Sequence, residues 1–407
     1  MNCRHCKKEL KHSFLDLGFA PPSNAYVSAK NLNSPEIYFP LRIKVCDSCW
    51  LVQTEDYAQA HELFTSDYAY FSSTSSSWLE HSKQYVDKVT NRFSLDSSNF
   101  VIEVASNDGY LLKNFVDQGI PCLGIEPTQS TADEAERKNV TTLRSFFGSE
   151  LASQLAEEGK KCDLIIGNNV YAHVPDVNDF TLGLKKVLKD TGVVTLEFPH
   201  LLNLIKFNQF DTVYHEHYSY LSLLTVKKIF QSVGLRIFDV EEISTHGGSL
   251  RVYGCHEEST HEMTSNVKNL LQAEVDFGLL MLKTYTNFQA KADKIKNDFV
   301  SFLIDQKRLD KKIVGYGAAA KGNTLLNYAG IKIDLLPFVC DLAASKQGKF
   351  LPGNHLPILK PEMIQKVKPD FIVIFPWNLK KEVMSNFAEV SEWGCKFVVA
   401  VPELKIL

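Results

Sequence analysis

The sequence predicts an α/β fold in which two Rossmann-like parallel sheets follow a small zinc-binding domain. Apolar strands alternate with helices over residues 100–253, and the same alternation returns over residues 313–401. Ahead of both lie two Cys-x-x-Cys pairs. We therefore expect three domains: residues 1–65 for zinc binding, 66–265 for the first Rossmann-like domain, and 266–407 for a helical bridge and the second.

The composition is that of an ordinary globular protein. The chain has 407 residues, 23% of them charged, and a formal net charge of −4, which gives no basic footprint for nucleic acid. No apolar run is long enough to span a bilayer, and residues 1–10 lack the apolar core of a signal peptide. We expect a cytoplasmic protein that binds neither nucleic acid nor membrane; monomer and homo-oligomer both stay open.

Four cysteines form the zinc motif at the N-terminus. Cys3 and Cys6 flank two residues, as do Cys46 and Cys49. Four thiolates close a tetrahedral zinc site, so we expect structural zinc. The alternative is a redox Cys-x-x-Cys pair, which needs a thioredoxin-like βαβ unit beside it, and none follows. The nine cysteines are an odd number, which favours metal binding and reduced thiols over a disulfide framework.

Residues 64–78, FTSDYAYFSSTSSSW, are rich in tyrosine and serine and show no helical or strand period. A plain linker is one interpretation. A lid over a pocket is the other, because Tyr68, Tyr70 and Phe71 are large side chains that a linker does not need. An amphipathic helix over residues 79–93 then leads into the first sheet.

The first Rossmann-like unit begins at FVIEVASNDGYLL, residues 100–112. Its apolar β-branched run stops at the small polar segment SNDG, and a helix follows. A second strand, residues 122–125, ends on Glu126. An acidic residue at that position accepts both hydroxyls of a ribose in nucleotide-binding βαβ units. The alternative is a generic turn followed by an ordinary surface glutamate.

The alternation continues through the central domain. The strand at residues 163–167 ends in NNVYAHVPD, which places Asn168, Asn169 and His173 at the sheet edge that carries Ser106, Asn107 and Asp108. We further expect helices at residues 130–138 and 179–188, a short strand and turn at residues 140–147, and strands at residues 193–198, 235–240 and 249–253.

The densest polar cluster follows in FDTVYHEHYSYLS. Tyr214, His215, Glu216 and His217 are four consecutive titratable groups. In a strand they alternate between two faces, whereas in a loop any of them can converge. Metal binding is one interpretation, although the helical spacing of HExxH is missing. General acid–base work by a histidine is another, because an imidazole exchanges protons near neutral pH. A hydrogen-bonded structural cluster is the third.

The C-terminal unit follows a long helix expected over residues 266–306. Residues 313–330, IVGYGAAAKGNTLLNYAG, predict a strand, a glycine-rich turn and a helix. The turn lets backbone amides approach a phosphate, with Lys321 near the helix start. The alternative is a domain that serves dimerisation only. Further strands are expected at residues 336–340, 371–375 and 396–401, and their edge offers Asp341, Ser345, Lys346, Pro376, Trp377 and Asn378.

Six motifs, taken in order, cover essentially the whole chain. They are the Cys-x-x-Cys pairs, EVASNDGYLL, NNVYAHVPD, FDTVYHEHYSYLS, HGGSLRVY and YGAAAKGNTLLNY. In this set the sequence resembles the S-adenosylmethionine (SAM)-dependent sugar C-methyltransferases. That family combines a zinc-binding domain, a class I methyltransferase core and a C-terminal Rossmann-like domain. One departure is that ASNDG stands where the wider class of SAM enzymes has several glycines.

The resemblance implies methyl transfer from SAM to C3 of a nucleotide-linked 4-keto-6-deoxy sugar. It implies His217 as the base, with Tyr214, Glu216, His173 and Tyr68 beside it. It implies SAM binding by Glu103, Ser106, Asn107, Asp108, Gly109, Glu126 and Asn168. It implies substrate binding by Tyr70, Lys321, Gly322, Asn323, Asp341, Trp377 and Asn378.

The implied chemistry is physically consistent. The 4-ketone acidifies the C3 proton, a neutral imidazole removes that proton, and a hydrogen-bond donor, Tyr214 or His173, stabilises the enolate oxygen. Two other functions remain open. A nicotinamide-dependent sugar-nucleotide oxidoreductase also uses an acidic ribose ligand, although GxGxxG is missing from the first turn. A zinc-ribbon scaffold that binds nucleotide sugars without turnover is the non-enzymatic alternative.

Overall fold

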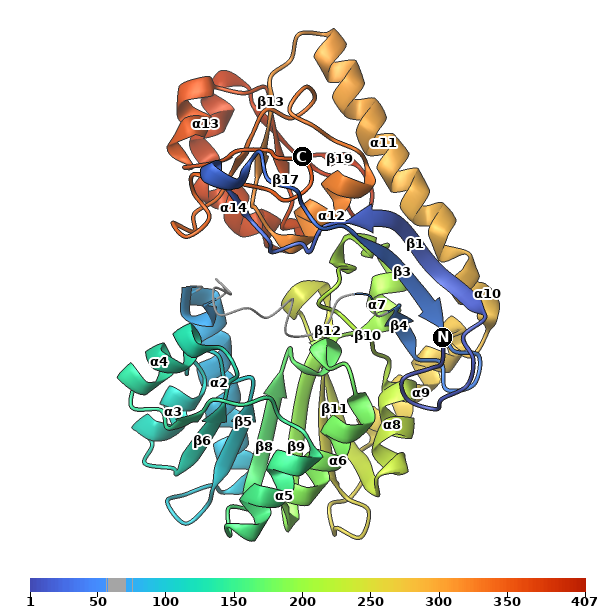
Figure 1. The fold of residues 1–407 in the computed structure, drawn as a ribbon, viewed down its shortest axis with the longest axis vertical. Helices are drawn as coiled ribbons and strands as arrows, with labels where there is room; N and C mark the ends of the chain where they lie inside the picture. Colours follow the sequence, from blue (N-terminus) through green and yellow to red (C-terminus); the bar gives the residue numbers. More distant parts are fainter. Residues whose placement is uncertain (56, 58–70, 75) are drawn as a thin grey trace.

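The computed structural model describes residues 1–55, 57, 71–74 and 76–407. In Figure 1 the lower part is the sheet of the middle of the chain, called the central sheet below, together with its helices. The smaller C-terminal unit lies at the top, and the N-terminal strands lie beside the long helix α11 at the right. The described residues thus form two sheet units connected along one side.

The central sheet has seven strands in the order β11-β12-β9-β8-β5-β6-β7. All neighbours pair in parallel except β12, which runs antiparallel to both β9 and β11. The chain moves outward from β5 and then returns to β8, so these adjacent strands form the topological switch point where ligands bind. The strands are β5 (Val101–Val104), β6 (Cys122–Ile125), β7 (Thr142–Leu143), β8 (Cys162–Asn168), β9 (Leu188–Pro199), β11 (Leu235–Ile243) and β12 (Ser249–His256).

Helices cover both faces of this sheet, as a parallel sheet requires. The expected helix at residues 179–188 begins earlier, because Asp176 caps it by accepting from the amides of Asn178 and Asp179. These helices are α2 (Ser76–Phe93), α3 (Leu112–Asp117), α4 (Gln129–Arg137), α5 (Ser149–Glu157), α6 (Val177–Val187) and α8 (Leu223–Ser232). The short helix α7 (Leu201–Lys206) follows β9 and packs in the core shared with the N-terminal strands and the C-terminal unit.

The C-terminal sheet has the order β16-β14-β13-β17-β18-β19 and is parallel except for its last strand. Its switch point lies between β13 and β17. The strand expected at residues 336–340 is shorter, with two residues. The elements are β13 (Ile313–Tyr316), α12 (Ala320–Tyr328), β14 (Val339–Cys340), β16 (Ile358–Leu359), α13 (Glu362–Val367), β17 (Phe371–Ile374), α14 (Lys380–Asn386), β18 (Lys396–Val399) and β19 (Lys405–Ile406).

The N-terminal strands bind to both other parts of the molecule. β1 (His12–Ala20), β3 (Phe39–Val45) and β4 (Val52–Thr54) form an antiparallel sheet, and β10 (Ser219–Tyr220) of the central unit pairs with β4. On the other side, β2 (Val27–Ser28) pairs with β15 (Lys349–Phe350) of the C-terminal unit. Phe14 of β1 stacks on Phe288 of α11 with ring centroids 4.7 Å apart. The N-terminal segment therefore connects the two sheet units.

Residues 266–306 are helical, as predicted, but the segment is divided. Three helices occupy that region: α9 (Ser265–Phe277), α10 (Leu282–Thr286) and α11 (Phe288–Arg308). Gly278 adopts the left-handed conformation with φ of 94° and ends α9, which a glycine does at little steric cost. No helix among the described residues combines the length and the hydropathy that crossing a bilayer requires.

Candidate active site

The four cysteines of the N-terminal motif converge. Their Sγ atoms lie within 4.8 Å of one another, with Cys3–Cys49 and Cys6–Cys46 both at 3.5 Å. A tetrahedron with Zn–S bonds of about 2.3 Å has edges of about 3.8 Å. The four thiols therefore fit Zn²⁺ and leave it no open coordination position, which makes the site structural.

Arg4, inside the first cysteine pair, connects this zinc site to two loops of the central unit. Its guanidinium donates to Pro175 O at 2.7 Å and to Thr54 O at 3.2 Å, and it lies 5.3 Å from the ring centre of Tyr218. Pro175 follows His173 by two residues, and Tyr218 follows His217 directly. The zinc-binding segment thus supports both histidine-bearing loops.

The turn after β5 has an unusual backbone. Ala105, Asn107 and Gly109 all have positive φ values, 56°, 50° and 71°. This compact turn fits under β6 because Gly124 has no side chain: a Cβ there would lie 2.4 Å from Ser106 Oγ. The side chain of Ser106 therefore fills the space that the missing side chain of Gly124 leaves on the neighbouring strand.

Several oxygens around this turn are buried and have no partner among the residues that the structure describes. They are Glu103 Oε2, Ser106 Oγ, Asp108 Oδ1 and Asn168 Oδ1. Buried polar groups are normally hydrogen-bonded, so this group marks a place where a polar ligand completes the bonding. Burial, with the nearby charges of Asp108 and Glu126, raises the pKa of Glu103 well above its ordinary value. The amino and hydroxyl groups of SAM can donate to these acceptor oxygens, and the Ser106 hydroxyl can donate to an oxygen of SAM.

Glu126 is oriented by two backbone amides. Its Oε1 accepts from Thr128 N at 2.9 Å and its Oε2 from Asn107 N at 3.0 Å. Each carboxylate oxygen keeps a further lone pair, so the geometry leaves room for two ribose hydroxyls. Asn107 and Asp108 also bind the chain before α2, because Asn107 Oδ1 accepts from Ser72 N at 3.0 Å and Asp108 Oδ2 from Ser73 N at 3.2 Å.

Residues 214–217 form a loop, so the alternation expected for a strand does not apply. The ring of His217 lies 4.0 Å from that of Tyr214 and 4.6 Å from that of His173. His217 Nδ1 lies 3.1 Å from Thr212 O. A carbonyl only accepts, so Nδ1 carries the proton and Nε2 of the neutral ring has a bare lone pair. Burial lowers the pKa of His217 well below its ordinary value, and the neighbouring titratable ring of His173 adds to the shift.

His173, on η3 (Tyr171–His173) after β8, has the same tautomer as His217. Its Nδ1 lies 2.7 Å from Glu216 O, so Nδ1 donates and Nε2 of the neutral ring is an acceptor. Burial lowers the pKa of His173 to about 4, which keeps the ring neutral at pH 7. His215 points the other way, toward Phe39 O at 3.3 Å. Glu216 Oε1 accepts from Asn24 Nδ2 at 3.2 Å, so it is positioned by the N-terminal segment.

Lys321 and Trp377 of the C-terminal unit face the same region. Lys321 Nζ donates to Asn378 Oδ1 at 2.7 Å and lies 4.6 Å from the ring centre of Trp377. Trp377 Nε1 donates across to Asp211 Oδ2 of η4 (Phe210–Thr212) at 2.7 Å. Burial raises the pKa of Asp211 to about 6. The charge of Lys321 contributes to the lowered pKa of His217, so the two side chains are electrostatic neighbours.

The glycine-rich turn of the C-terminal unit is filled by protein groups. Ala318 N donates to Asp341 Oδ2 at 2.7 Å. A Cβ on Gly317 would lie 2.3 Å from Pro376, and one on Gly322 would lie 2.8 Å from Phe375. These glycines allow the close approach of the chain after β17. Asn323 is buried on the same helix, and its Nδ2 has no partner among the described residues.

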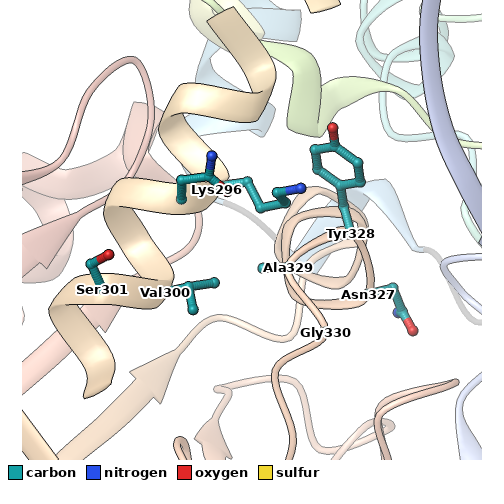
Figure 2. Close-up of a pocket in the computed structure, with 8 residues that line it drawn as sticks. Lys296, Val300, Ser301, Asn327, Tyr328, Ala329 and Gly330 are labelled. Carbon is teal, nitrogen blue, oxygen red and sulfur yellow. The ribbon is translucent and has the colours of Figure 1, made fainter. Parts of the chain in front are cut away.

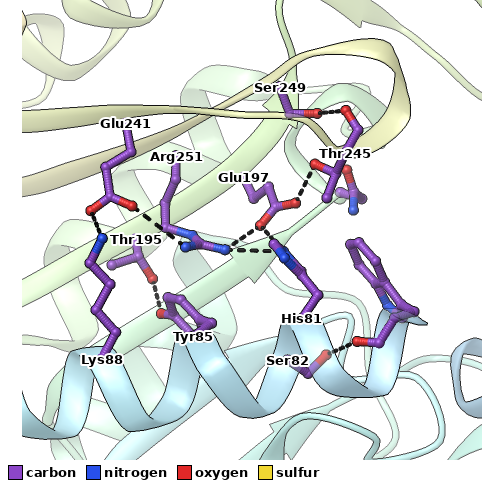
Figure 3. A network of polar contacts seen from close by, with 12 residues as sticks. His81, Ser82, Tyr85, Lys88, Thr195, Glu197, Glu241, Thr245, Ser249 and Arg251 are labelled. Carbon is purple, nitrogen blue, oxygen red and sulfur yellow. Dashed lines mark hydrogen bonds and ion pairs between the residues drawn. The ribbon is translucent and has the colours of Figure 1, made fainter. Parts of the chain in front are cut away.

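Sequence reasoning missed a charged network at the end of β9 (Figure 3). Glu197 Oε2 accepts from Arg251 at 2.7 Å and lies 3.1 Å from His81 Nε2, while Glu197 Oε1 accepts from Thr245 Oγ1 at 3.0 Å. Against the cost of burial, His81 and Arg251 lower the pKa of Glu197 to about 2. The network ties α2 to β9 and β12. The HGGS motif was its available signal, because a glycine pair there predicts a turn beside the sheet edge.

Two hollows lie away from these groups. One, of about 490 Å³, lies between α11 and the end of α12 (Figure 2). The other, of about 370 Å³, lies beside α6 and is lined by Lys7, Asp176, Asn178, Asp179, Leu182, Ser232 and Val233. Neither contains a predicted site residue. Tyr68 and Tyr70, and most of the predicted lid, lie outside the described residues.

Comparison with known families divides the chain into three. Residues 3–64 match the model described as "Putative zinc binding domain", residues 78–240 match "Methyltransferase domain", and residues 244–402 match "C-methyltransferase C-terminal domain". These matches agree in order with the cysteine site, the central sheet and the C-terminal sheet.

Individual proteins extend the comparison. The C-methyltransferase NovU of Streptomyces niveus is 31% identical over 405 residues, covering 100% of this chain and 96% of that protein. A ubiquinone biosynthesis O-methyltransferase of Bartonella quintana is 27% identical over 95 residues, which is 23% of this chain and 38% of that protein. An S-adenosylmethionine-dependent methyltransferase structure from Clostridium acetobutylicum has 13% identity and a TM-score of 0.36, covering 44% of this chain and 92% of that one. With a full-length relative and matches to both methyltransferase models, the chain belongs to the family of SAM-dependent C-methyltransferases that carry an N-terminal zinc-binding domain.

Proposed function

We propose that this enzyme methylates C3 of a nucleotide-linked 4-keto-6-deoxy sugar in branched deoxysugar biosynthesis. The observation that carries the proposal is the bare Nε2 of His217, a neutral imidazole nitrogen beside Tyr214 and His173. A carbon acid next to a ketone needs such a base and needs no metal at the reacting carbon. The kinship with NovU, a C-methyltransferase, supports transfer to carbon.

The turn after β5 and the end of β8 are the proposed cofactor site. Glu126 would accept the ribose hydroxyls, while Ser106, Asn107, Asp108 and Gly109 would surround the methionine end, with Glu103 and Asn168 beside them. When bound, SAM supplies a methyl group on a positively charged sulfur. The protein's task is then to hold the nucleophilic carbon about 3 Å from that methyl, in line with the breaking bond.

The base removes the C3 proton and the electron pair moves into the ketone, which becomes an enolate. His217 Nε2 takes the proton in this proposal, and Tyr214 lies beside it. Glu216, fixed by Asn24, would orient the loop. The tautomer of His173 makes its Nε2 an acceptor while the ring is neutral, which disfavours His173 as the donor to the enolate oxygen.

The nucleotide part of the substrate would lie against the C-terminal unit, with Lys321 as its cation and Gly322, Asn323, Asp341, Trp377 and Asn378 around it. Lys321 is half-buried and interacts electrostatically with Asp211, so an arriving diphosphate would meet a positioned cation. In this proposal residues 1–65 hold zinc, residues 66–265 hold SAM, and residues 266–407 hold the sugar nucleotide.

The test is turnover with labelled SAM and a panel of nucleoside-diphosphate 4-keto-6-deoxyhexoses. We expect label at C3 of one panel member and equimolar S-adenosylhomocysteine. His217→Ala should lower kcat by 10²–10⁴-fold, with the Kd for SAM within about threefold of wild type. His215→Ala is the matched control, because His215 stands in the same motif and faces Phe39; its kcat should stay within about threefold.

Other outcomes point to the alternatives. Thermal stabilisation by NAD and not by SAM would indicate an oxidoreductase. Binding of the sugar nucleotides without S-adenosylhomocysteine formation would indicate a scaffold. Equal losses in both histidine variants would show that the motif is structural.

A further inference from the structure

The turn between β11 and β12 places a third histidine at the carboxyl edge of the central sheet. Thr245, His246 and Gly247 form the short helix η5, and His246 has a φ of 53°. A non-glycine residue in the left-handed region is strained, and such residues are frequent at functional sites. The turn is held by Thr245 Oγ1, which donates to Glu197, and by Ser249 Oγ, which donates to Thr245 O at 3.0 Å.

The same turn lies directly under the C-terminal unit. A Cβ on Gly247 would lie 2.4 Å from the ring of Trp377. Gln209 Nε2 donates to Gly247 O at 2.8 Å, which fixes the turn to the chain just before Asp211. His246 is thus placed where the two sheet units meet.

The hydrogen bond of His246 sets a tautomer opposite to that of His173 and His217. Asn169 Nδ2, at the end of β8, lies 3.3 Å from His246 Nε2. An amide nitrogen only donates, so Nε2 accepts and the ring proton is on Nδ1. No hydrogen bond to this Nδ1 occurs among the described residues. His217 offers an acceptor nitrogen, whereas His246 offers an N–H.

The surroundings keep this ring neutral. Burial, followed by the charge of Lys321, lowers the pKa of His246 to about 4; His81 and His173 act in the same direction and Glu197 opposes them. The Trp78 ring contacts the imidazole edge-on at a centroid distance of 5.4 Å. A neutral N–H donor stabilises an anionic oxygen without repelling a cationic sulfonium nearby.

We propose that His246 is a catalytic residue that donates its Nδ1–H to the enolate oxygen. The inference rests on the proposed function. In the step, the C3–H bond breaks, its proton goes to His217 Nε2, and its electron pair forms the C3–C4 double bond. The ketone pair moves onto O4, where the His246 N–H binds it. The pair then returns as C3 bonds to the methyl carbon, and the C–S pair stays on sulfur.

The test is a pair of variants whose side chains differ only in one terminal group, an NH₂ in Asn and an oxygen in Asp. Asn and Asp both tolerate the left-handed backbone and have nearly the same shape. In His246→Asn the amide NH₂ takes the place of Nδ1–H, so kcat should stay within about tenfold of wild type. His246→Asp has only acceptors, so its kcat should fall at least 10²-fold. His246→Gly, which keeps the backbone and adds no charge, should fall similarly.

A second measurement separates a catalytic role from a structural one. With S-adenosylhomocysteine in place of SAM, exchange of the C3 proton in D₂O reports enolate formation alone. We expect the exchange rate to fall with kcat in the Asp and Gly variants, while the Kd for SAM and the melting temperature of the Gly variant stay near those of wild type.

Equal kcat in His246→Asn and His246→Asp, or normal exchange in His246→Gly, would overturn the inference. An inactive wild-type enzyme across the whole sugar panel would instead overturn the proposed function. Wild-type turnover in the same assay therefore distinguishes the two failures.

Discussion

The two sheet units have the same design at their switch points and differ in what occupies them. In each unit, the acidic residue after the second strand accepts a hydrogen bond from a backbone amide in the turn after the first strand. Glu126 accepts from Asn107 N at 3.0 Å, and Asp341 accepts from Ala318 N at 2.7 Å. Around the first turn, four buried oxygens lack partners among the described residues. Around the second, Phe375 and Pro376 contact the glycine positions.

The difference teaches that a glycine-rich turn and a ligand cradle are separable features. The first turn has one glycine at residues 105–109, and buried polar atoms around it lack hydrogen-bond partners among the described residues. The second has the glycines, and they accommodate neighbouring side chains. Lys321, beyond that turn, donates to Asn378 and lies against the ring of Trp377.

Matched substitutions of the two acids test this contrast most strongly. Glu126→Ala should raise the Kd for SAM at least 10²-fold, because two charge-assisted hydrogen bonds to the ribose are lost. Asp341→Ala should leave that Kd within about threefold. Isothermal titration of each purified variant with SAM measures both. A similar loss in the two variants would mean that the second turn also binds SAM.

Glycine substitutions in the second unit test whether the glycines of its turn serve packing within the protein. Gly317→Ala should destabilise the protein by about 3 kcal/mol, because the new methyl overlaps Pro376 and the φ of 91° disfavours alanine. Gly330→Ala is the control: its φ is 66° and nothing lies within 4 Å of its Cβ. About 1 kcal/mol is expected there. Thermal unfolding of both, with and without a sugar nucleotide, decides whether the turn packs or binds.

Asp211 gives a pH-dependent test of the contact between the units. Its folded pKa of about 6 lies above the ordinary value of 3.8. The contribution of this group to stability is therefore full below pH 4 and is lost as the pH rises through 6. Asp211→Asn keeps an acceptor for Trp377 and cannot ionise. We expect it to exceed wild type by about 2 kcal/mol at pH 7.5 and to match it at pH 4.

Melting temperatures across this pH range provide the measurement. Asp305→Asn is the control, since Asp305 is exposed and should give no pH-dependent difference. A variant of Asp211 that is less stable than wild type at pH 7.5 would show that the ionised carboxylate is favourable at the contact with Trp377 and Lys321.

The sequence predicted the fold where local pattern determines it. The β-branched run at residues 101–104, the turn SNDG and the acid at 126 all belong to one local unit, and the model match to a methyltransferase domain confirms that architecture. The cysteine spacing likewise predicted a cluster that the structure brings within zinc-binding distance. The break at Gly278 was missed, because an isolated glycine also occurs inside helices.

The candidate site depends more on contacts between distant segments. A loop conformation decides that His217 meets Tyr214 and that His215 turns toward Phe39, and no residue pattern within HEH distinguishes the two rings. The bond from Trp377 to Asp211 joins residues of two domains. The roles predicted for individual site residues stay predictions until the variants above are measured.

The position of Arg4 has a consequence for how the enzyme folds. The turn that holds two of the four cysteines also holds the guanidinium that donates to Pro175 O and lies against the ring of Tyr218. Contacts of such long sequence separation form late. The metal-bound turn and the two histidine loops must therefore each form before they dock, so loss of zinc should loosen both loops together.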